Sequence, residues 1–203
     1  MTPTLKLLVA VLTATAVCGA AHAAAGDHPS VNRALAHLRN RGTDADAYAL
    51  RDVIVDADGS AHVRFDRSYK GLRVIGGDVV VHANARGELR DYSETLRGAV
   101  RTDTRARFDD AEAIQYAQSI YTGQADGRPS AQLVIYARGA EPQLAYDVTF
   151  RGENAEGTPS VLHMIIDASS LQRLDQYDEV MTASSAGIGD TLLSGAVTIT
   201  TDS

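Results

Sequence analysis

Two stretches of the chain carry apolar residues at the three-to-four-residue spacing of an amphipathic helix. The first begins where Ser30 can cap a helix and stops at Gly42. The second begins after the potential cap Asp109 and stops at Gly123. The apolar faces consist of Val31, Ala34, Leu35 and Leu38 in the first stretch, and of Ala113, Ile114, Ala117, Ile120 and Tyr121 in the second. The pattern therefore predicts two helices that are far apart in the sequence.

After each helix the pattern changes to the alternation of apolar and polar residues that is typical of strands. The strands predicted after the first helix are 48–56, 62–69, 78–83 and 88–96. Those predicted after the second helix are 131–137, 143–151, 160–167 and 172–180. Asp58-Gly59 lies between two alternating runs, which is a strong signal for a tight hairpin. The polar stretches 97–107 and 124–130 are predicted to be a linker and a loop.

The two sets of elements are related by a constant offset of 81 residues. This offset aligns Val63–Gly71 with Leu144–Gly152, matching apolar, aromatic, acidic, basic and glycine positions in turn. It also aligns 53–55 with 134–136, 80–82 with 161–163, and Gly42 with Gly123. One offset over four segments favours a duplication over chance similarity between two hairpins. We therefore expect an α+β fold of two duplicated units, each with a helix packed on an antiparallel sheet.

The first 23 residues have the features of a secretion signal. Lys6 precedes the apolar run Leu7–Val17, and Ala21-His22-Ala23 is a small-x-small cleavage site. The run is too short to span a bilayer. Cys18 lacks the preceding residues of a lipoprotein site, because Thr15 and Val17 occupy those positions. We therefore expect export to the extracellular space or the periplasm, with no membrane attachment once the signal is removed.

The end of the chain departs from the repeat. Residues 182–190 are mostly Ala, Ser and Gly, which predicts a flexible segment. Residues 192–200 alternate like a strand. A terminal strand without a partner would expose an unpaired edge. The pattern therefore indicates that the strand at 192–200 is the first part of a larger structural unit.

Composition narrows the possible functions. The chain has 203 residues, of which 44% are hydrophobic and 22% charged, as in ordinary globular proteins. The net charge is −7 and no Lys/Arg-rich run occurs, so nucleic acid is not an expected partner. The one cysteine lies within the signal. Without the signal the chain has no thiol, and its remaining length of about 180 residues can form a stable core without disulfides.

Motifs of several enzyme classes are missing from the sequence. It has no His-Glu-x-x-His, no Gly-x-Ser-x-Gly and no glycine-rich phosphate loop. His82 and His163 could bind a metal only if they converged with a carboxylate, and a repeated structural position is the simpler interpretation. Asp66 and Asp147 could act as an acid–base pair, but duplication also explains them. Residues 56–59 fit a hairpin turn better than a calcium loop. We expect no catalytic, cofactor-binding or metal-ligating residues.

Residues Ala61–His82 resemble the fungalysin/thermolysin propeptide motif, a strand pair followed by an apolar strand that ends in His. The positions that carry the resemblance are Arg64, Phe65, Tyr69, Gly71, Gly76, Gly77 and His82. Asp66 and Arg73 stand where the family often has Gln and Pro. In the second half, residues 144–148 and 166–168 resemble a PepSY domain. The residues after Ala183 resemble the start of a thermolysin-like zinc peptidase.

The resemblance implies a domain order and a cystatin-like or PepSY-like fold for each unit. The expected segments are the signal (1–23), a propeptide-like domain (26–97), a PepSY-like domain (107–180) and a junction leading into a peptidase-like segment (183–203). The chain would then be the pro-segment of a secreted zinc metallopeptidase zymogen. It would inhibit the peptidase domain and assist its folding, without being an enzyme itself.

The resemblance also implies a partner and a contact segment. The partner would be a thermolysin-like zinc peptidase domain, in cis or in trans. The catalytic domain would lie outside this sequence, and zinc and calcium are expected only there. The segment expected to approach the catalytic groove comprises Tyr177, Asp178, Glu179, Val180, Met181, Thr182, Ala183, Ser184 and Ser185. The alternative is a secreted, non-catalytic binding module for another extracellular ligand.

Overall fold

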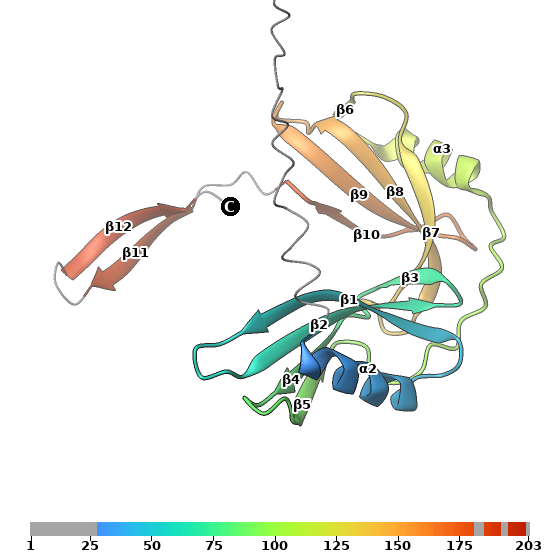
Figure 1. Ribbon diagram of the computed structural model, residues 1–203. Coiled ribbons are helices and arrows are strands. Elements are labelled where there is room, and N and C mark those ends of the chain that lie inside the picture. Colours follow the sequence, from blue (N-terminus) through green and yellow to red (C-terminus); the bar gives the residue numbers. More distant parts are fainter. Residues whose placement is uncertain (1–27, 181–184, 192–194, 202–203) are drawn as a thin grey trace, which may run out of the picture.

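Two helices cover a curled, mostly antiparallel sheet, so the expected α+β class is confirmed (Figure 1). The computed structural model describes residues 28–180 in full, and the backbone of 185–191 and 195–201. The expected signal at 1–23 lies outside the described residues. The sheet has ten strands, and its main path runs β10-β9-β8-β7-β3-β2-β4-β5. Beside this path, β1 pairs with β2 and β6 pairs with β8.

The first unit packs helix α2 (Pro29–Arg41) on four antiparallel strands. These are β1 (Asp46–Val55), β2 (Ala61–Tyr69), β4 (Val79–Ala83) and β5 (Leu89–Glu94). Alternate residues of β2 and β4 are buried, and these residues face the helix. The buried core of this unit consists of Val31, Ala34, Leu38, Val63, Phe65, Val79 and Val81.

The second unit packs helix α3 (Asp110–Ile120) on a similar antiparallel sheet. Its strands are β7 (Ser130–Tyr136), β8 (Gln143–Glu153), β9 (Pro159–Asp167) and β10 (Arg173–Asp178). The short strand β6 (Gln124–Ala125) lies where a loop is expected, because it pairs with the end of β8. The core under α3 consists of Ala113, Ala117, Tyr146, Val148, Phe150, Met164, Ile166 and Ala168.

Strand β3 (Leu72–Ile75) joins the two units and was not expected from the sequence. It folds back on the end of β2, where Ser68 pairs with Arg73. It then pairs in parallel with β7, with Val74 opposite Ile135. A separate apolar cluster forms around this junction from Tyr69, Val74, Val100, Ile135 and Ala137. The two units therefore share one continuous sheet.

Both helices differ slightly from their predicted limits. Helix α2 begins at Pro29 with His28 as its cap, so Ser30 is a buried first-turn residue and not the cap. Proline fits this position because its fixed φ suits the first helical turn. Asp109 caps α3 as expected, in a reciprocal capping box with Glu112. Neither helix, the only two within the described residues, is long and apolar enough to cross a membrane.

The sequence predicted that helix α3 ends at Gly123. The helix already stops at Ile120. The glycine is needed for close packing instead. A Cβ atom on Gly123 would lie 2.3 Å from the carbonyl oxygen of Glu153 at the end of β8. The chain can pass β8 here only because the residue has no side chain.

A buried ion pair anchors the linker between the units. The guanidinium of Arg67 donates from Nε to Asp46 Oδ1 over 2.8 Å, and both side chains are almost fully buried. The same guanidinium donates to the carbonyl oxygen of Gly98 over 3.1 and 3.2 Å. The other oxygen of Asp46 accepts hydrogen bonds from Thr43. The linker is thus fixed to the first unit by a charged group inside the protein.

The strand pairing does not keep the offset of 81 residues. Phe65 pairs with Val79, so the offset would place Tyr146 opposite Ser160. Tyr146 instead pairs with Ile166. In this fully described part of the chain, β3 also has no counterpart between β8 and β9. Duplication of a helix-on-sheet unit therefore stays a prediction.

The segment after the second unit contains a hairpin. Strand β11 (Ser185–Thr191) pairs with β12 (Gly195–Thr201) in a separate two-stranded sheet. Residues 185–190 of the segment that we expect to be flexible lie in strand β11, and the expected last strand pairs with it. Small residues do not exclude a strand when a neighbouring strand satisfies the backbone hydrogen bonds.

Candidate functional site

The end of β10 is fastened to the start of β9 through Asp178. Its Oδ2 accepts a hydrogen bond from Ser160 Oγ at 2.5 Å. Its Oδ1 accepts from the backbone N–H groups of Val161, at 3.0 Å, and Val180, at 2.9 Å. The N–H of Glu179 also donates to the Val161 carbonyl oxygen over 3.0 Å. These bonds fix the direction of the chain at Val180, the last residue described before the expected contact segment continues.

The same bonds keep the Asp178 carboxyl ionised. Burial raises its pKa, but the hydrogen bonds from Ser160, Val180 and Val161 lower it by more, so the pKa lies below its ordinary value of 3.8. A carboxylate that accepts several hydrogen bonds is a strong anchor because each bond is assisted by its charge.

We expect Asp178→Asn to lower the free energy of unfolding by about 1.5–3 kcal/mol at neutral pH, since hydrogen bonds to a charged group are lost. Because the folded pKa is depressed, the carboxylate contributes fully above its unfolded pKa. The contribution is lost as the pH falls through the lower folded value. Urea denaturation at neutral and acidic pH measures the difference. The exposed Glu156→Gln is the control, and equal losses in the two variants would contradict the anchor.

His163 lies next to this anchor, between two carboxylates. Its Nδ1 is 2.7 Å from Asp147 Oδ1, and the Asp147 side chain is buried. Its Nε2 is 3.1 Å from Glu179 Oε1, an ion-pair distance without hydrogen-bond geometry. The ring of Tyr177 stacks on the imidazole, with 4.8 Å between centroids. Two residues of the expected contact segment thus pack on β9.

Arg73 connects this cluster to the first unit. It comes from β3 and pairs with Asp147, so the buried carboxylate lies between the Arg73 guanidinium and the His163 imidazole. The sequence marked Arg73 only as a departure from the family pattern. Strands β3, β8, β9 and β10 therefore meet through the contacting side chains of Arg73, Asp147, His163 and Tyr177.

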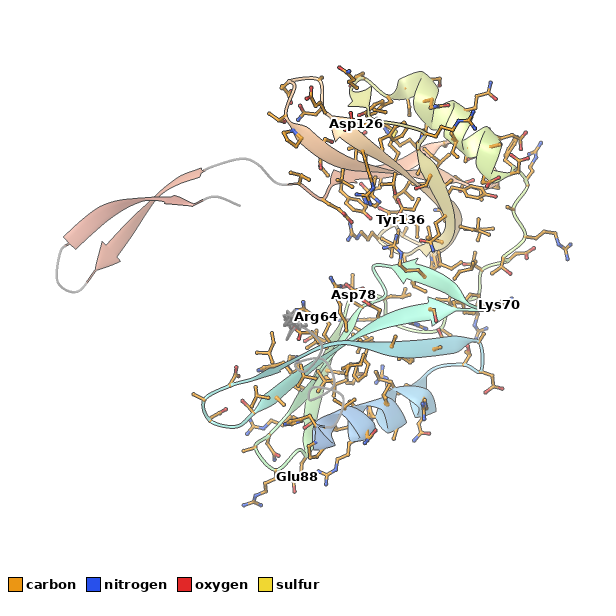
Figure 2. All side chains as sticks on the ribbon, turned by 45° about the horizontal axis from the view of Figure 1, so that its top comes forward. Arg64, Lys70, Asp78, Glu88, Asp126 and Tyr136 are labelled. Atoms are coloured by element: carbon orange, nitrogen blue, oxygen red, sulfur yellow. The ribbon has the colours of Figure 1, made fainter. Side chains whose placement is uncertain are left out.

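A cleft of about 370 Å³ opens beside this cluster, between the two units. Its walls carry charges of both signs from both units. In Figure 2, Asp78 lies on the side of the first unit that faces the second unit, and Tyr136 lies on the side of the second unit that faces the first. The cleft is lined by Arg51, Asp66, Arg73, Val74, Ile75, Gly76, Asp78, Arg138, Tyr177 and Glu179.

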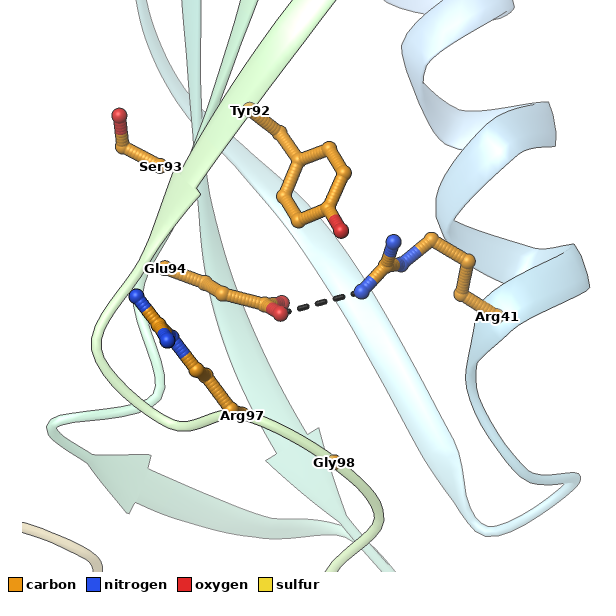
Figure 3. A pocket seen from close by; sticks show the side chains of 6 residues that line it. All are labelled: Arg41, Tyr92, Ser93, Glu94, Arg97 and Gly98. Atoms are coloured by element: carbon orange, nitrogen blue, oxygen red, sulfur yellow. Dashed lines mark hydrogen bonds and ion pairs between the residues drawn. The ribbon is translucent and has the colours of Figure 1, made fainter.

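A second, more open hollow of about 560 Å³ lies at the end of α2 (Figure 3). Arg41 of the last helical turn donates to Glu94 over 3.0 Å, and its guanidinium carbon lies 3.9 Å from the centre of the Tyr92 ring. These contacts join the helix to β5. This hollow contains no residue of the expected contact segment.

Most of the residues that carry the resemblance to the propeptide motif have a structural role. Phe65 and Tyr69 are buried, whereas Arg64 is exposed on the face of β2 that is turned away from α2. His82 pairs with His62, so the structure does not bring it to His163. Asp66 contacts Arg51 and not Asp147. Within the described residues, no group of three or more His, Cys, Asp or Glu side chains could hold a metal ion.

The glycines of the motif shape the junction around β3. Lys70 and Gly71 both have positive φ in the turn between β2 and β3. Gly76 has a φ of 83°, and a Cβ there would lie 2.8 Å from Arg138 Cγ. A Cβ on Gly77 would lie 2.6 Å from Val74 Cγ1. The motif thus positions β3 and permits its close approach to the second unit.

Comparison with known proteins agrees with this assignment of the motif. Residues 46–96, which span β1 to β5, match the model of the Fungalysin/Thermolysin Propeptide Motif. This part of the chain is similar to the fungalysin/thermolysin propeptide motif. The resemblance of Ala61–His82 to the propeptide motif is therefore confirmed, and the match covers all the strands of the first unit.

Three curated relatives extend the similarity beyond the propeptide motif. The chain is 34% identical over 171 residues to the transglutaminase-activating metalloprotease of Streptomyces mobaraensis, covering 80% of this chain and 22% of the relative. It is 30% identical over 143 residues to thermolysin of Alicyclobacillus acidocaldarius subsp. acidocaldarius, covering 65% and 26%. It is 26% identical over 173 residues to bacillolysin of Bacillus subtilis (strain 168), covering 77% and 32%.

The chain thus spans a third or less of the length of these relatives. Among solved structures, the Bacillus megaterium YpeB C-terminal domain matches with a TM-score of 0.40 and 14% identity, covering 73% of this chain and 63% of that domain.

Proposed function

We propose that this chain is the pro-segment of a secreted thermolysin-like zinc metallopeptidase, and that it inhibits the peptidase domain and assists its folding. The match of residues 46–96 to the propeptide motif carries the proposal. The names of the relatives, a metalloprotease and thermolysin, support it. In this proposal the chain has no catalytic role, and zinc and calcium belong to the peptidase domain.

The anchored end of β10 suggests how inhibition works. Tyr177, Asp178 and Glu179 are held on β9, so the backbone is fixed as far as Val180. The segment continues through Met181–Ser184, which lie outside the described residues, into Ser185 of β11. An extended segment can add to a strand edge in a peptidase groove. Fixing its first residues lowers the entropic cost of ordering it.

Covalent linkage would strengthen this inhibition. A segment joined to the peptidase acts at a high effective concentration, so modest intrinsic affinity is sufficient in cis. In trans, the same contacts must work at the concentration of the free chain. The folded scaffold would also offer a surface on which a β-rich, slowly folding peptidase domain could form.

The finer domain assignment is part of the proposal. The propeptide-like unit would comprise 26–97, a PepSY-like unit 107–180 and a peptidase-like segment 183–203. The two units would derive from one duplicated, cystatin-like ancestor. Each unit has one helix followed by four antiparallel strands, if the short strands β3 and β6 are set aside, and this shared order supports the proposal. Phe65 and Tyr146 each lie in the core beneath the helix of their own unit.

The cleft between the units favours one alternative. It is lined by arginine and acidic side chains from both units, as a site for a charged extracellular ligand would be. A secreted, non-catalytic binding module would use this cleft and would have no need of an anchored end of β10.

Inhibition by the purified chain tests the proposal. Titration against a secreted thermolysin-like peptidase should give stoichiometric or near-stoichiometric inhibition, and refolding yields of that peptidase should rise. A synthetic peptide of residues 177–185 should inhibit far more weakly, because it lacks the anchor on β9. Asp178→Asn should weaken inhibition, with Glu156→Gln as the matched control. Absence of both inhibition and refolding assistance would favour the binding module.

Export is tested separately. The secreted product should begin near Ala24, and a cut between Ala25 and Gly26 is the second possibility. N-terminal sequencing of the extracellular or periplasmic protein measures this. A soluble cytoplasmic product that retains Met1 would contradict export.

A further inference from the structure

His62 and His82 face each other directly on neighbouring strands of the first unit. They are opposite residues in the pairing of β2 with β4. Their Nδ1 atoms are 2.6 Å apart and the two rings meet edge to face. They lie on the sheet face away from α2, and their side chains are 35% and 27% exposed. Small ions in the solvent can therefore reach the pair.

The outer nitrogen of His62 is held by an acceptor. Asp56 Oδ2 lies 2.8 Å from His62 Nε2. An ionised carboxylate only accepts hydrogen bonds, so it keeps the proton on Nε2 and leaves a lone pair on Nδ1. This carboxylate–imidazole arrangement is the one that orients histidine ligands in metal sites and raises their basicity.

The outer nitrogen of His82 has a partner that permits either tautomer. Ser93 Oγ lies 3.0 Å from His82 Nε2, and a hydroxyl can donate or accept. Without a metal, the proton on His82 Nδ1 bridges to the lone pair of His62. When that proton is placed on Nε2 instead, where Ser93 accepts it, both Nδ1 atoms present lone pairs to the same point.

We propose that His62 and His82 form a binding site for a divalent transition-metal ion, with Zn²⁺, Ni²⁺ and Cu²⁺ as the fitting class. Imidazole nitrogens suit these ions, and zinc–nitrogen bonds are about 2.0–2.1 Å long. Tetrahedral coordination then needs about 3.3 Å between the two Nδ1 atoms. Small ring rotations of these partly exposed side chains supply the difference.

The proton balance of metal entry is simple. From the neutral pair, the ion binds both Nδ1 lone pairs, and the bridging proton moves to Nε2 of His82. No net proton is released. From the protonated pair, one proton leaves to solvent for each ion bound, so binding weakens as the pH falls. The remaining coordination positions are open to water, since no third ligating side chain joins the pair within the described residues.

The surroundings of the pair are more acidic than basic. Asp91 lies opposite His82 on β5, and its Oδ1 is 4.0 Å from His82 Nε2. Ile54 lies opposite His62 on β1, and Arg64 is two residues along β2 on the same face. Asp56, Asp58 and Asp91, set against Arg64 and Arg90, leave an excess of negative charge that favours a divalent cation. The bound ion would clamp β2 to β4 near the turn at 56–60, independently of any peptidase partner.

Titration calorimetry of the metal-free full chain with Zn²⁺ alone tests the proposal. We expect saturable binding of one ion at about pH 7.5, weakened at about pH 5.5 where imidazoles gain protons. His62→Gln and His82→Gln should each lose at least about tenfold in affinity, and Asp56→Asn about 10–100-fold. His37→Gln, which removes a histidine on α2 far from the pair, is the matched control and should bind normally.

A spectroscopic readout keeps the test independent of variant stability. In the wild-type chain, Zn²⁺ should shift the ¹⁵N resonances of Nδ1 in both His62 and His82. It should also shift Nε2 of His82, which gains the proton, and leave Nε2 of His62 nearly unchanged. Absence of saturable binding would overturn the site. So would unchanged affinity in His62→Gln and His82→Gln, or zinc shifts confined to other histidines.

Discussion

Phe65→Ala is expected to lower the free energy of unfolding by about 3–5 kcal/mol. The ring is fully buried and packs in the core between β2 and helix α2, with Ala34 and Leu38 on the helix side. Its removal costs the transfer free energy of the ring and leaves a cavity that the rigid sheet cannot close. Urea denaturation followed by circular dichroism measures the loss.

The matched control for this change is Ile54→Ala on β1. Ile54 is 50% exposed, so its truncation should change the free energy of unfolding by about 0.5 kcal/mol or less. A loss below about 1 kcal/mol for Phe65→Ala would mean that the ring does not form part of the core.

Arg67→Met is expected to be as damaging, with a loss of about 3–5 kcal/mol, because it leaves the buried Asp46 carboxylate without its cation. It also removes the hydrogen bonds to Gly98 that fix the linker. Burial raises the Asp46 pKa, and the bonds from Arg67 and Thr43 lower it by more, to below the ordinary value. Without Arg67 the carboxyl should take up a proton more easily, so the loss should shrink in acid.

Two variants isolate the effect of the buried charge. Arg51→Met removes an exposed partner of Asp66, 3.5 Å away, and should cost no more than about 1 kcal/mol. The double variant Arg67→Met with Asp46→Asn should recover part of the stability lost in Arg67→Met. Failure of the second change to restore any stability, together with a pH-independent loss, would argue against an uncompensated charge.

Local sequence signals predicted the elements well where neighbours in the chain determine them. The capping of α3 depends on Asp109 and Glu112, three residues apart, and was predicted from the sequence. The alternation along β2 and β4 likewise gave the buried face correctly. The start of α2 was placed two residues late, because His28 and not Ser30 is the cap and Pro29 occupies the first helical position.

Long-range pairing explains what the sequence could not predict. Strand β3 has only four residues and gains its identity from a parallel partner about 60 residues later in the chain, which no local pattern reveals. The first residues of the expected contact segment lie at the end of β10, but the sequence did not reveal the bonds that anchor them there. Arg73 meets Asp147 across 74 residues, and Ser160 meets Asp178 through side chains that look unremarkable in sequence.

Because strand β3 links the two units in one sheet, heat or mechanical force should unfold them together. Domains joined by a free linker can melt one at a time, each with its own transition. Here the pairing of Val74 with Ile135 makes the two units parts of one hydrogen-bonded ladder. Unfolding of the first unit would remove strand β3 from its pairing with β7. It would also remove Arg73 from its ion pair with Asp147. The hydrogen bonds that hold the end of β10 therefore depend on the stability of the whole sheet. The opposite edge of that sheet, β5, lies beneath helix α2.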